Sequence, residues 1–210
     1  MERVRREFTG CWLGAVCLFC LLFSFCSPTT RNDPVLDKPL DELSDEDISR
    51  MVAVVTTNYG DFKIELHPEW APQTTRNFIK LIKAGFYEGL TFHEVRPTFW
   101  IRGGDPKGDG TGGPGYYVPL ETPSGPHEKG AVGLYHPVIA PDEGGSQFYI
   151  LLRMYPKWNG HYTVFGRVSE GMVTVDIIGD LPITPKDGKP RGYMPLSPVI
   201  IKEIHLEVKR

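Results

Sequence analysis

Two stretches of the sequence combine aromatic rings with an amide side chain and fixed positive charges. The first, TFHEVRPTFWIRGGD, covers Thr91–Asp105, and the second, GGSQFYI, covers Gly144–Ile150. A guanidinium stays charged at physiological pH, an amide both donates and accepts hydrogen bonds, and aromatic rings offer apolar faces. This combination suits an uncharged, proline-like ligand better than a phosphate or a sugar.

The first of these stretches is predicted to form two strands with a bend between them. Phe92–Arg96 and Phe99–Arg102 both have strand chemistry, and Pro97 separates them. Proline lacks a backbone donor and resists a central position in a sheet, so Pro97 marks the predicted bend.

The rest of the chain contains many short strand patterns and few helical ones. The predicted strands are Val52–Thr57, Phe62–Leu66, Gly130–Leu134, Ser146–Leu152, Thr163–Val168 and Ile200–Val208. The predicted helices are Pro72–Ala84 and Gly171–Asp180, and Pro182–Pro195 is predicted to be a loop. Short alternating strands with so few helices favour a closed β-barrel, which also leaves no exposed sheet edges.

A glycine-rich segment lies between the two aromatic stretches. Lys107–Gly115, KGDGTGGPG, matches the letters of a dinucleotide fingerprint. That fingerprint requires a strand before it and a helix after it, whereas here Pro114 and Gly115 follow the glycines. The segment is therefore predicted to be a mobile loop over a strand edge rather than a nucleotide site.

Composition excludes several classes of function. The 210-residue chain has a formal net charge of -3, which gives no support for a nucleic-acid partner. The four cysteines all lie near the N-terminus, at Cys11, Cys17, Cys20 and Cys26. The rest of the chain therefore cannot form a disulfide framework or a thiolate zinc site. His93 has no second His or Cys at ligand spacing, so it is expected to be structural. No metal and no cofactor are predicted.

Residues 1–26 have the pattern of a leader. Arg3, Arg5 and Arg6 form a basic region, and Cys11–Phe25 is a nearly unbroken apolar run. The run ends in LFSFC, which resembles a loose bacterial lipobox with Cys26 as the acylated residue. A lipoprotein, an uncleaved membrane anchor and a secreted protein all remain open. Each of them places the domain outside the cytoplasm, either attached to a membrane or in the periplasm.

Residues 27–50 are rich in proline, serine, threonine and acidic side chains, with scattered apolar residues. This composition predicts an acidic flexible tether, ending in a short helix capped by Ser44. The folded domain is expected over residues 51–210.

Five segments of the domain resemble the cyclophilin family of peptidyl-prolyl cis-trans isomerases, in the family order and at similar spacing. They are TNYGDFKIELHPEWAPQTTRNFIKL, GFYEGLTFHEV, RGGDPKGDGTGG, GGSQFYI and GHYTVFGRV. The resemblance covers Val52–Val208. It implies a closed antiparallel eight-stranded barrel capped by two α-helices, with a proline site on its outer face. It also implies a monomer that binds proline-containing segments of client proteins and needs no cofactor.

The resemblance assigns roles to residues in both aromatic stretches and near the strand Thr163–Val168. The substrate-binding residues that it implies are Phe99, Trp100, Tyr149, Trp158 and Tyr162, with Gln147 contacting the substrate amide. Trp158 follows Lys157, which occupies the family's tryptophan position. Arg102 stands where the family usually has glutamine.

One position departs from the family pattern. The catalytic arginine, two residues after the phenylalanine of the family's FHR motif, is replaced here by Glu94. Side chains two residues apart share a face of a strand, so Glu94 lies with Arg96, and Trp100 with Arg102. Our hypothesis is that Arg96 or Arg102, paired with Glu94, supplies the missing cation, and that turnover is reduced. The alternatives are a proline-peptide binding module without turnover and a surface interaction or scaffold protein.

Overall fold

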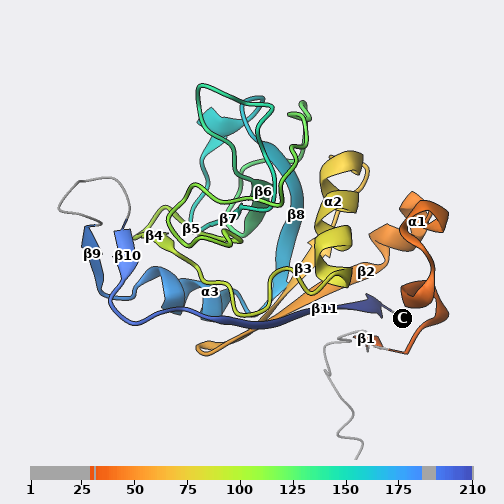
Figure 1. Cartoon of the computed structure of the whole chain (residues 1–210), viewed down its shortest axis with the longest axis horizontal. Coiled ribbons are helices and arrows are strands. Elements are labelled where there is room, and N and C mark those ends of the chain that lie inside the picture. The colour runs from red at the N-terminus through yellow and green to blue at the C-terminus, as the bar shows by residue number, and fades with distance from the viewer. Residues whose placement is uncertain (1–28, 31, 186–192, 210) are drawn as a thin grey trace, which may run out of the picture.

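The computed structural model describes residues 29–30, 32–185 and 193–209, which form a mainly β fold (Figure 1). The first strands are β1 (Thr29–Thr30), β2 (Met51–Thr57), β3 (Gly60–Leu66), β4 (Glu94–Arg96), β5 (Trp100–Gly103) and β6 (Ala131–Leu134). They are followed by β7 (Phe148–Leu151), β8 (Thr163–Glu170), β9 (Ile183–Pro185), β10 (Tyr193–Pro195) and β11 (Ile201–Lys209). The helices are α1 (Asp45–Ser49), α2 (Pro72–Lys83) and α3 (Met172–Gly179), with 3-10 turns η1 (Pro34–Asp37), η2 (Leu40–Glu42) and η3 (Pro156–Trp158).

One antiparallel sheet contains all of the predicted barrel strands. Its order is β1-β11-β2-β3-β8-β6-β7-β5-β4, so the short β1 is added outside β11. The sheet curls until β4 approaches β11, where Phe92 N donates to Val199 O at 2.9 Å and Ile201 N donates to Leu90 O at 2.8 Å. The mainly β, antiparallel prediction is confirmed. Closure is less complete than predicted, because these few bonds replace a full ladder between the two ends.

Two helices cover the curled sheet, as predicted. Helix α2 contacts β8 and β11, and α3 contacts β3, β4 and β5. Pro72 begins α2 at a position where its missing N–H costs no hydrogen bond. Phe78 on its buried face lies 5.5 Å from the Phe148 ring and 5.0 Å from the Phe165 ring. Burying such side chains stabilises the fold by about 1.5–3 kcal/mol each.

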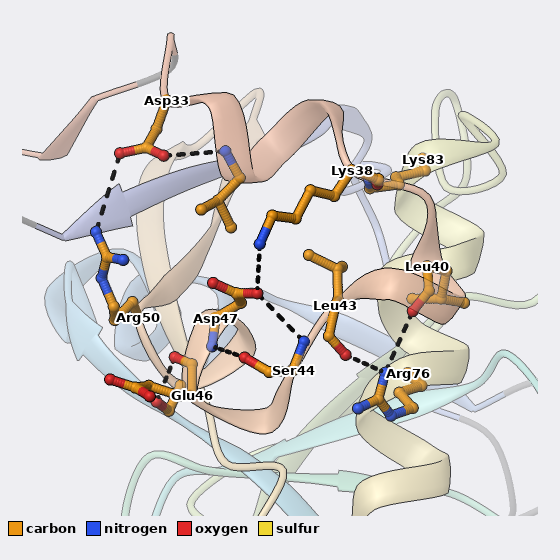
Figure 2. A network of polar contacts seen from close by, with 12 residues as sticks. Asp33, Lys38, Leu40, Leu43, Ser44, Glu46, Asp47, Arg50, Arg76 and Lys83 are labelled. Atoms are coloured by element: carbon orange, nitrogen blue, oxygen red, sulfur yellow. Dashed lines mark hydrogen bonds and ion pairs between the residues drawn. The ribbon is translucent and has the colours of Figure 1, made fainter.

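Residues 33–50 form an N-terminal strap that lies against the domain (Figure 2). Ser44 caps α1, because its side chain accepts from Asp47 N while the Asp47 side chain accepts from Ser44 N. Arg76 of α2 donates to Leu40 O at 3.2 Å and to Leu43 O at 3.0 Å. The capped helix predicted at Ser44 is present, and α2 holds the turn before it.

The strap also contributes apolar side chains to the core. Ile48 is fully buried and Leu43 is buried with it. Lys83 of α2 donates to Leu36 O at 2.9 Å and to Lys38 O at 2.6 Å. The sequence predicts a flexible tether over residues 27–50, whereas the structure holds residues 33–50 against α2 and the sheet. Composition alone misses this packing, because the cations that bind the strap carbonyls come from another part of the chain.

The stretch Pro182–Pro195 is predicted to be a loop, but its described ends form a small hairpin. Strand β9 pairs with β10, with Thr184 opposite Met194. The predicted leader, including Cys26, lies outside the described residues. Within the part of the chain that the structure describes, no helix has both the length and the apolar character needed to cross a bilayer.

Candidate functional site

Strands β4 and β5 bring the charged residues of the first aromatic stretch together. They pair antiparallel, with Glu94 opposite Arg102 and Arg96 opposite Trp100. The turn between them contains Pro97, as predicted, and Thr98 adopts a left-handed conformation with φ of 60°. Phe99 N donates to Arg96 O at 2.9 Å and closes this turn. The hairpin therefore fixes one carboxylate and two guanidinium groups on neighbouring strands.

Glu94 is a buried carboxylate held by two arginines. Its Oε1 accepts from Arg96 Nε at 2.7 Å, and its Oε2 accepts from Arg102 Nη2. The Glu94 side chain is 4% exposed and that of Arg102 is 9% exposed, whereas Arg96 is partly open to solvent at 32%. The three groups carry a net positive charge. Arg102 Nε and Nη1 are buried and find no hydrogen-bond partner among the described residues.

Aromatic rings surround the Arg102 guanidinium. Its central carbon lies 3.8 Å from the ring centroid of Tyr135 and 5.4 Å from that of Trp100. Such cation–π contacts hold a guanidinium while leaving its edge donors free. Tyr135 was not predicted as a site residue. Its only sequence signal is an aromatic residue directly after a predicted strand, which does not reveal what it contacts.

The five predicted substrate-binding residues lie in one aromatic cluster. Its members are Phe99, Trp100, Tyr149, Trp158 and Tyr162. The Trp158 ring lies 5.1 Å from Phe99, 5.3 Å from Tyr149 and 4.5 Å from Tyr162. Tyr149 is fully buried, while Phe99 and Trp158 are partly exposed. The cluster thus presents Phe99 and Trp158 to solvent, with Tyr149 beneath them.

The Tyr149 hydroxyl is held beneath the cluster by His127. Tyr149 Oη lies 2.8 Å from His127 Nε2, and His127 Nδ1 lies 2.8 Å from Asn159 Oδ1. Burial lowers the pKa of His127 and raises the pKa of Tyr149 well above its usual value. A neutral His127 that donates from Nδ1 leaves Nε2 to accept the tyrosine proton. Gly133 provides the space, since a Cβ there would lie 2.1 Å from Tyr149 Oη.

Gln147 holds the glycine-rich loop. Its Nε2 donates to Gly110 O at 3.1 Å and to Gly112 O at 2.9 Å, while its Oε1 has no partner among the described residues. Asp105 holds the same loop from inside and accepts from Lys107 N at 2.8 Å and from Gly110 N. The loop lines a cavity of about 390 Å³ together with Tyr135 and Gln147. The amide oxygen of Gln147 is buried here without a hydrogen-bond partner among the described residues.

These groups meet around β5. Trp100 belongs to the aromatic cluster and lies under both Arg96 and Arg102. A Cβ at Gly110 would lie 3.2 Å from Arg102 Nη2, so the loop held by Gln147 passes close to this cation. The structure places the described residues that the sequence assigned to the site in one region, but Trp100, Tyr149 and Tyr162 are buried within it.

His93 is buried beside the charged residues. Burial lowers its pKa to about 4, and the Arg102 charge adds to this effect. No group of three His, Cys, Asp or Glu residues placed to bind a metal is present in the described ranges.

Comparisons with known proteins agree on one family. The family model "Cyclophilin type peptidyl-prolyl cis-trans isomerase/CLD" matches residues 51–206. Peptidyl-prolyl cis-trans isomerase B of Bacillus subtilis is 51% identical over 112 residues, which is 52% of this chain and 77% of the relative. A peptidyl-prolyl cis-trans isomerase of Helicobacter pylori is 39% identical over 147 residues, covering 67% of this chain and 89% of the relative.

Solved structures show the same likeness. The crystal structure of a cyclophilin type peptidyl-prolyl cis-trans isomerase from Cryptosporidium parvum matches with a TM-score of 0.68 and 31% identity, covering 76% of this chain and 99% of that one. A second structure of that protein, in the presence of the dipeptide Ala-Pro, matches with a TM-score of 0.66 and 32% identity, covering 76% and 98% of the two chains.

Proposed function

The chain belongs to the family of cyclophilin-type peptidyl-prolyl cis-trans isomerases, and from that premise we propose that it isomerises X-Pro bonds where Arg102 meets the aromatic cluster. The prolyl ring would rest on the partly exposed rings of Phe99 and Trp158. Gln147 Oε1 would accept a backbone N–H of the same peptide segment.

The reaction requires binding rather than bond-making chemistry. Rotation about the X-Pro bond faces a barrier of ~18–20 kcal/mol, because resonance gives the C–N bond partial double-bond character. A catalyst must bind the twisted amide better than the planar one. A donor that stabilises the carbonyl or the pyramidal nitrogen as resonance is lost performs this task, and no nucleophile is needed.

The observation that carries the proposal is the incomplete hydrogen bonding of the buried Arg102 guanidinium. Glu94 occupies Nη2, whereas Nε and Nη1 have no partner among the described residues. Glu94 and Arg102 face each other across the β4–β5 ladder. The cation that β4 lacks at Glu94 would thus be supplied by Arg102, which lies directly opposite on β5. Glu94 would act as the positioning residue that fixes the guanidinium.

The same carboxylate is proposed to reduce turnover. A negative charge beside Arg102 weakens the field that stabilises the twisted amide. Arg96 offsets part of this effect, since its Nε also donates to Glu94 at 2.7 Å. The activity is therefore expected to be below that of an enzyme with an unpaired arginine at this position.

Exchange spectroscopy on a short X-Pro peptide tests the role of Arg102. Arg102→Gln is expected to lower the isomerisation rate by ~10²–10³, the usual loss for one transition-state donor. Arg96→Gln is the matched variant, and a smaller loss is expected because this side chain is more exposed. A wild-type rate in Arg102→Gln would reject the proposed site.

Binding without turnover is the second candidate, and the Glu94–Arg102 ion pair favours it. In that case a proline peptide would bind the wild-type protein without any exchange broadening between its cis and trans signals.

The proposed setting of this activity is extracytoplasmic, with client proteins folding outside the cytoplasm. Its support is the leader pattern in residues 1–26, which includes the basic residues Arg3, Arg5 and Arg6. Palmitate labelling tests lipidation at Cys26. No label on the wild type, or label that survives Cys26→Ser, would remove the lipoprotein form of the proposal.

A further inference from the structure

Several of the described cationic side chains away from the site have a carboxylate partner. The paired cations are Lys38, Arg50, Lys63, Arg76, Lys129, Arg167 and Lys209. This pattern is expected in a chain with a formal net charge of -3, in which acidic groups outnumber basic ones. Other exposed cations, such as Lys80 and Lys202, have no ion pair with a described carboxylate and are exceptions to this pattern.

Arg153 is such an exception at the rim of the aromatic cluster. Its guanidinium carbon lies 5.3 Å from the ring centroid of Phe99 and 5.8 Å from that of Tyr155. The backbone next to Arg153 is held beside Phe99, because Leu152 N donates to Phe99 O at 2.9 Å. Arg153 is exposed and makes no ion pair with any described carboxylate. Lys157, on the adjacent turn η3, is also exposed and has no ion pair within the described ranges.

A guanidinium placed over an aromatic ring is well prepared to bind a carboxylate. The ring contact restricts the side chain while its edge N–H groups stay free, and two of them match the two oxygens of a carboxylate. Glu94, the nearby buried carboxylate, is already engaged by Arg96 and Arg102. It does not compete for Arg153. An acidic side chain on a bound peptide is the complementary group.

We propose that Arg153 is a specificity-determining residue that favours X-Pro segments with a Glu or Asp next to the proline. The inference rests on the proposed function, because Phe99 is the ring that would carry the prolyl group. Arg153 borders that ring, so a residue adjacent to proline falls within its reach. Lys157, on the same turn η3 as Trp158, adds positive charge and would strengthen the preference.

Paired peptides test this preference. One pair differs only by Glu or Gln directly before the proline, and a second pair differs in the same way directly after it. The wild-type kcat/KM for the Glu peptide is expected to exceed that for the Gln peptide by about two- to fivefold in at least one pair, the usual range for an exposed ion pair. The ratio should fall towards one at high salt.

Charge variants identify the residue responsible. Arg153→Gln should bring the Glu/Gln ratio to about one, and Arg153→Glu should reverse it. Lys202→Glu, on the exposed face of β11, changes the net charge by the same amount as Arg153→Glu and should leave the ratio unaltered. A ratio near one in the wild type, or an equal shift in Lys202→Glu, overturns the role of Arg153. Absence of isomerisation with all four peptides would instead reject the proposed function itself.

Discussion

The N-terminal strap and the candidate site both depend on buried or partly buried arginines, but they use them differently. Beside the strap, Arg76 of α2 donates to two backbone carbonyls of the strap, and its Nη2 pairs with Asp45 at 2.7 Å. In the site, Arg102 gives one nitrogen to Glu94 and leaves Nε and Nη1 without a partner among the described residues. Both terminal nitrogens of Arg76 are hydrogen-bonded, whereas two nitrogens of Arg102 are not.

This difference separates stability from function. A satisfied hydrogen-bonding group contributes about 0.5–1.5 kcal/mol to folding, whereas a buried donor or acceptor left without a partner costs about 1–3 kcal/mol. Arg102, Gln147 and Trp100 all keep such atoms in the site. The site therefore lowers the stability of the native state in exchange for binding capacity, and well-packed regions such as the strap offset that loss.

The largest expected effect tests whether the strap belongs to the cooperative fold. Ile48 is fully buried, so Ile48→Ala should lower the free energy of unfolding by about 2–5 kcal/mol, measured by denaturant titration. Ile48→Val is the graded control, with an expected loss of about 0.5–1.5 kcal/mol. Isomerisation by the folded fraction should not change. An unaltered unfolding midpoint in Ile48→Ala would mean that the strap unfolds separately.

The next largest effect is expected from exchanging the charges of Glu94 and Arg102. Because Glu94 and Arg102 are cross-strand partners, the double variant Glu94→Arg/Arg102→Gln moves the cation to the opposite strand. It should recover most of the ~10²–10³ in rate that Arg102→Gln alone loses. Glu94→Gln/Arg102→Gln lacks the cation and serves as the control. Equal rates for the two double variants would show that a cation on β4 does not replace the one on β5.

The smallest expected effect is a pH dependence in the strap. The Lys38 side chain and Ser44 N–H bind Asp47 and lower the pKa of its carboxyl. Because the folded pKa lies below the unfolded one, this contribution is complete above the unfolded pKa of about 4 and is lost as pH falls through the folded pKa. Unfolding free energies of wild type and Asp47→Asn should therefore converge on acidification. A constant difference at all pH values would contradict this.

Local patterns predicted much of the β framework but not the contacts across it. Pro97 correctly marked the bend between β4 and β5, and two-residue alternation placed Glu94 beside Arg96. The Glu94–Arg102 pair depends on the register of the hairpin, which the sequence leaves open. Tyr135 joins the site only because β6 and β5 both border β7, a relation that no local pattern contains.

The strap shows a second limit of composition. Asp and Pro residues in 33–50 resemble those of a solvated linker, and only long-range contacts with Arg76 and Lys83 distinguish the two. The buried Ile48 was the available signal, as an apolar residue four positions after the Ser44 cap. For the aromatic site, the residues were assigned from the family resemblance, and only Trp100 on β5 and Tyr149 on β7 lie on neighbouring strands. The hydrogen bond from Tyr149 to His127 could not be predicted from the sequence.

The pairing of β1 with β11 places both ends of the described chain at one pole of the domain. Thr30 lies opposite Val208, and Lys209 N donates to Arg50 O at 2.9 Å. Figure 1 shows this pole on the other side of the molecule from β4 and β5. A reporter protein or a surface linkage attached at either end would therefore leave the face that contains Arg102 turned outward. Immobilised domains of this kind would present their substrate face in a uniform orientation.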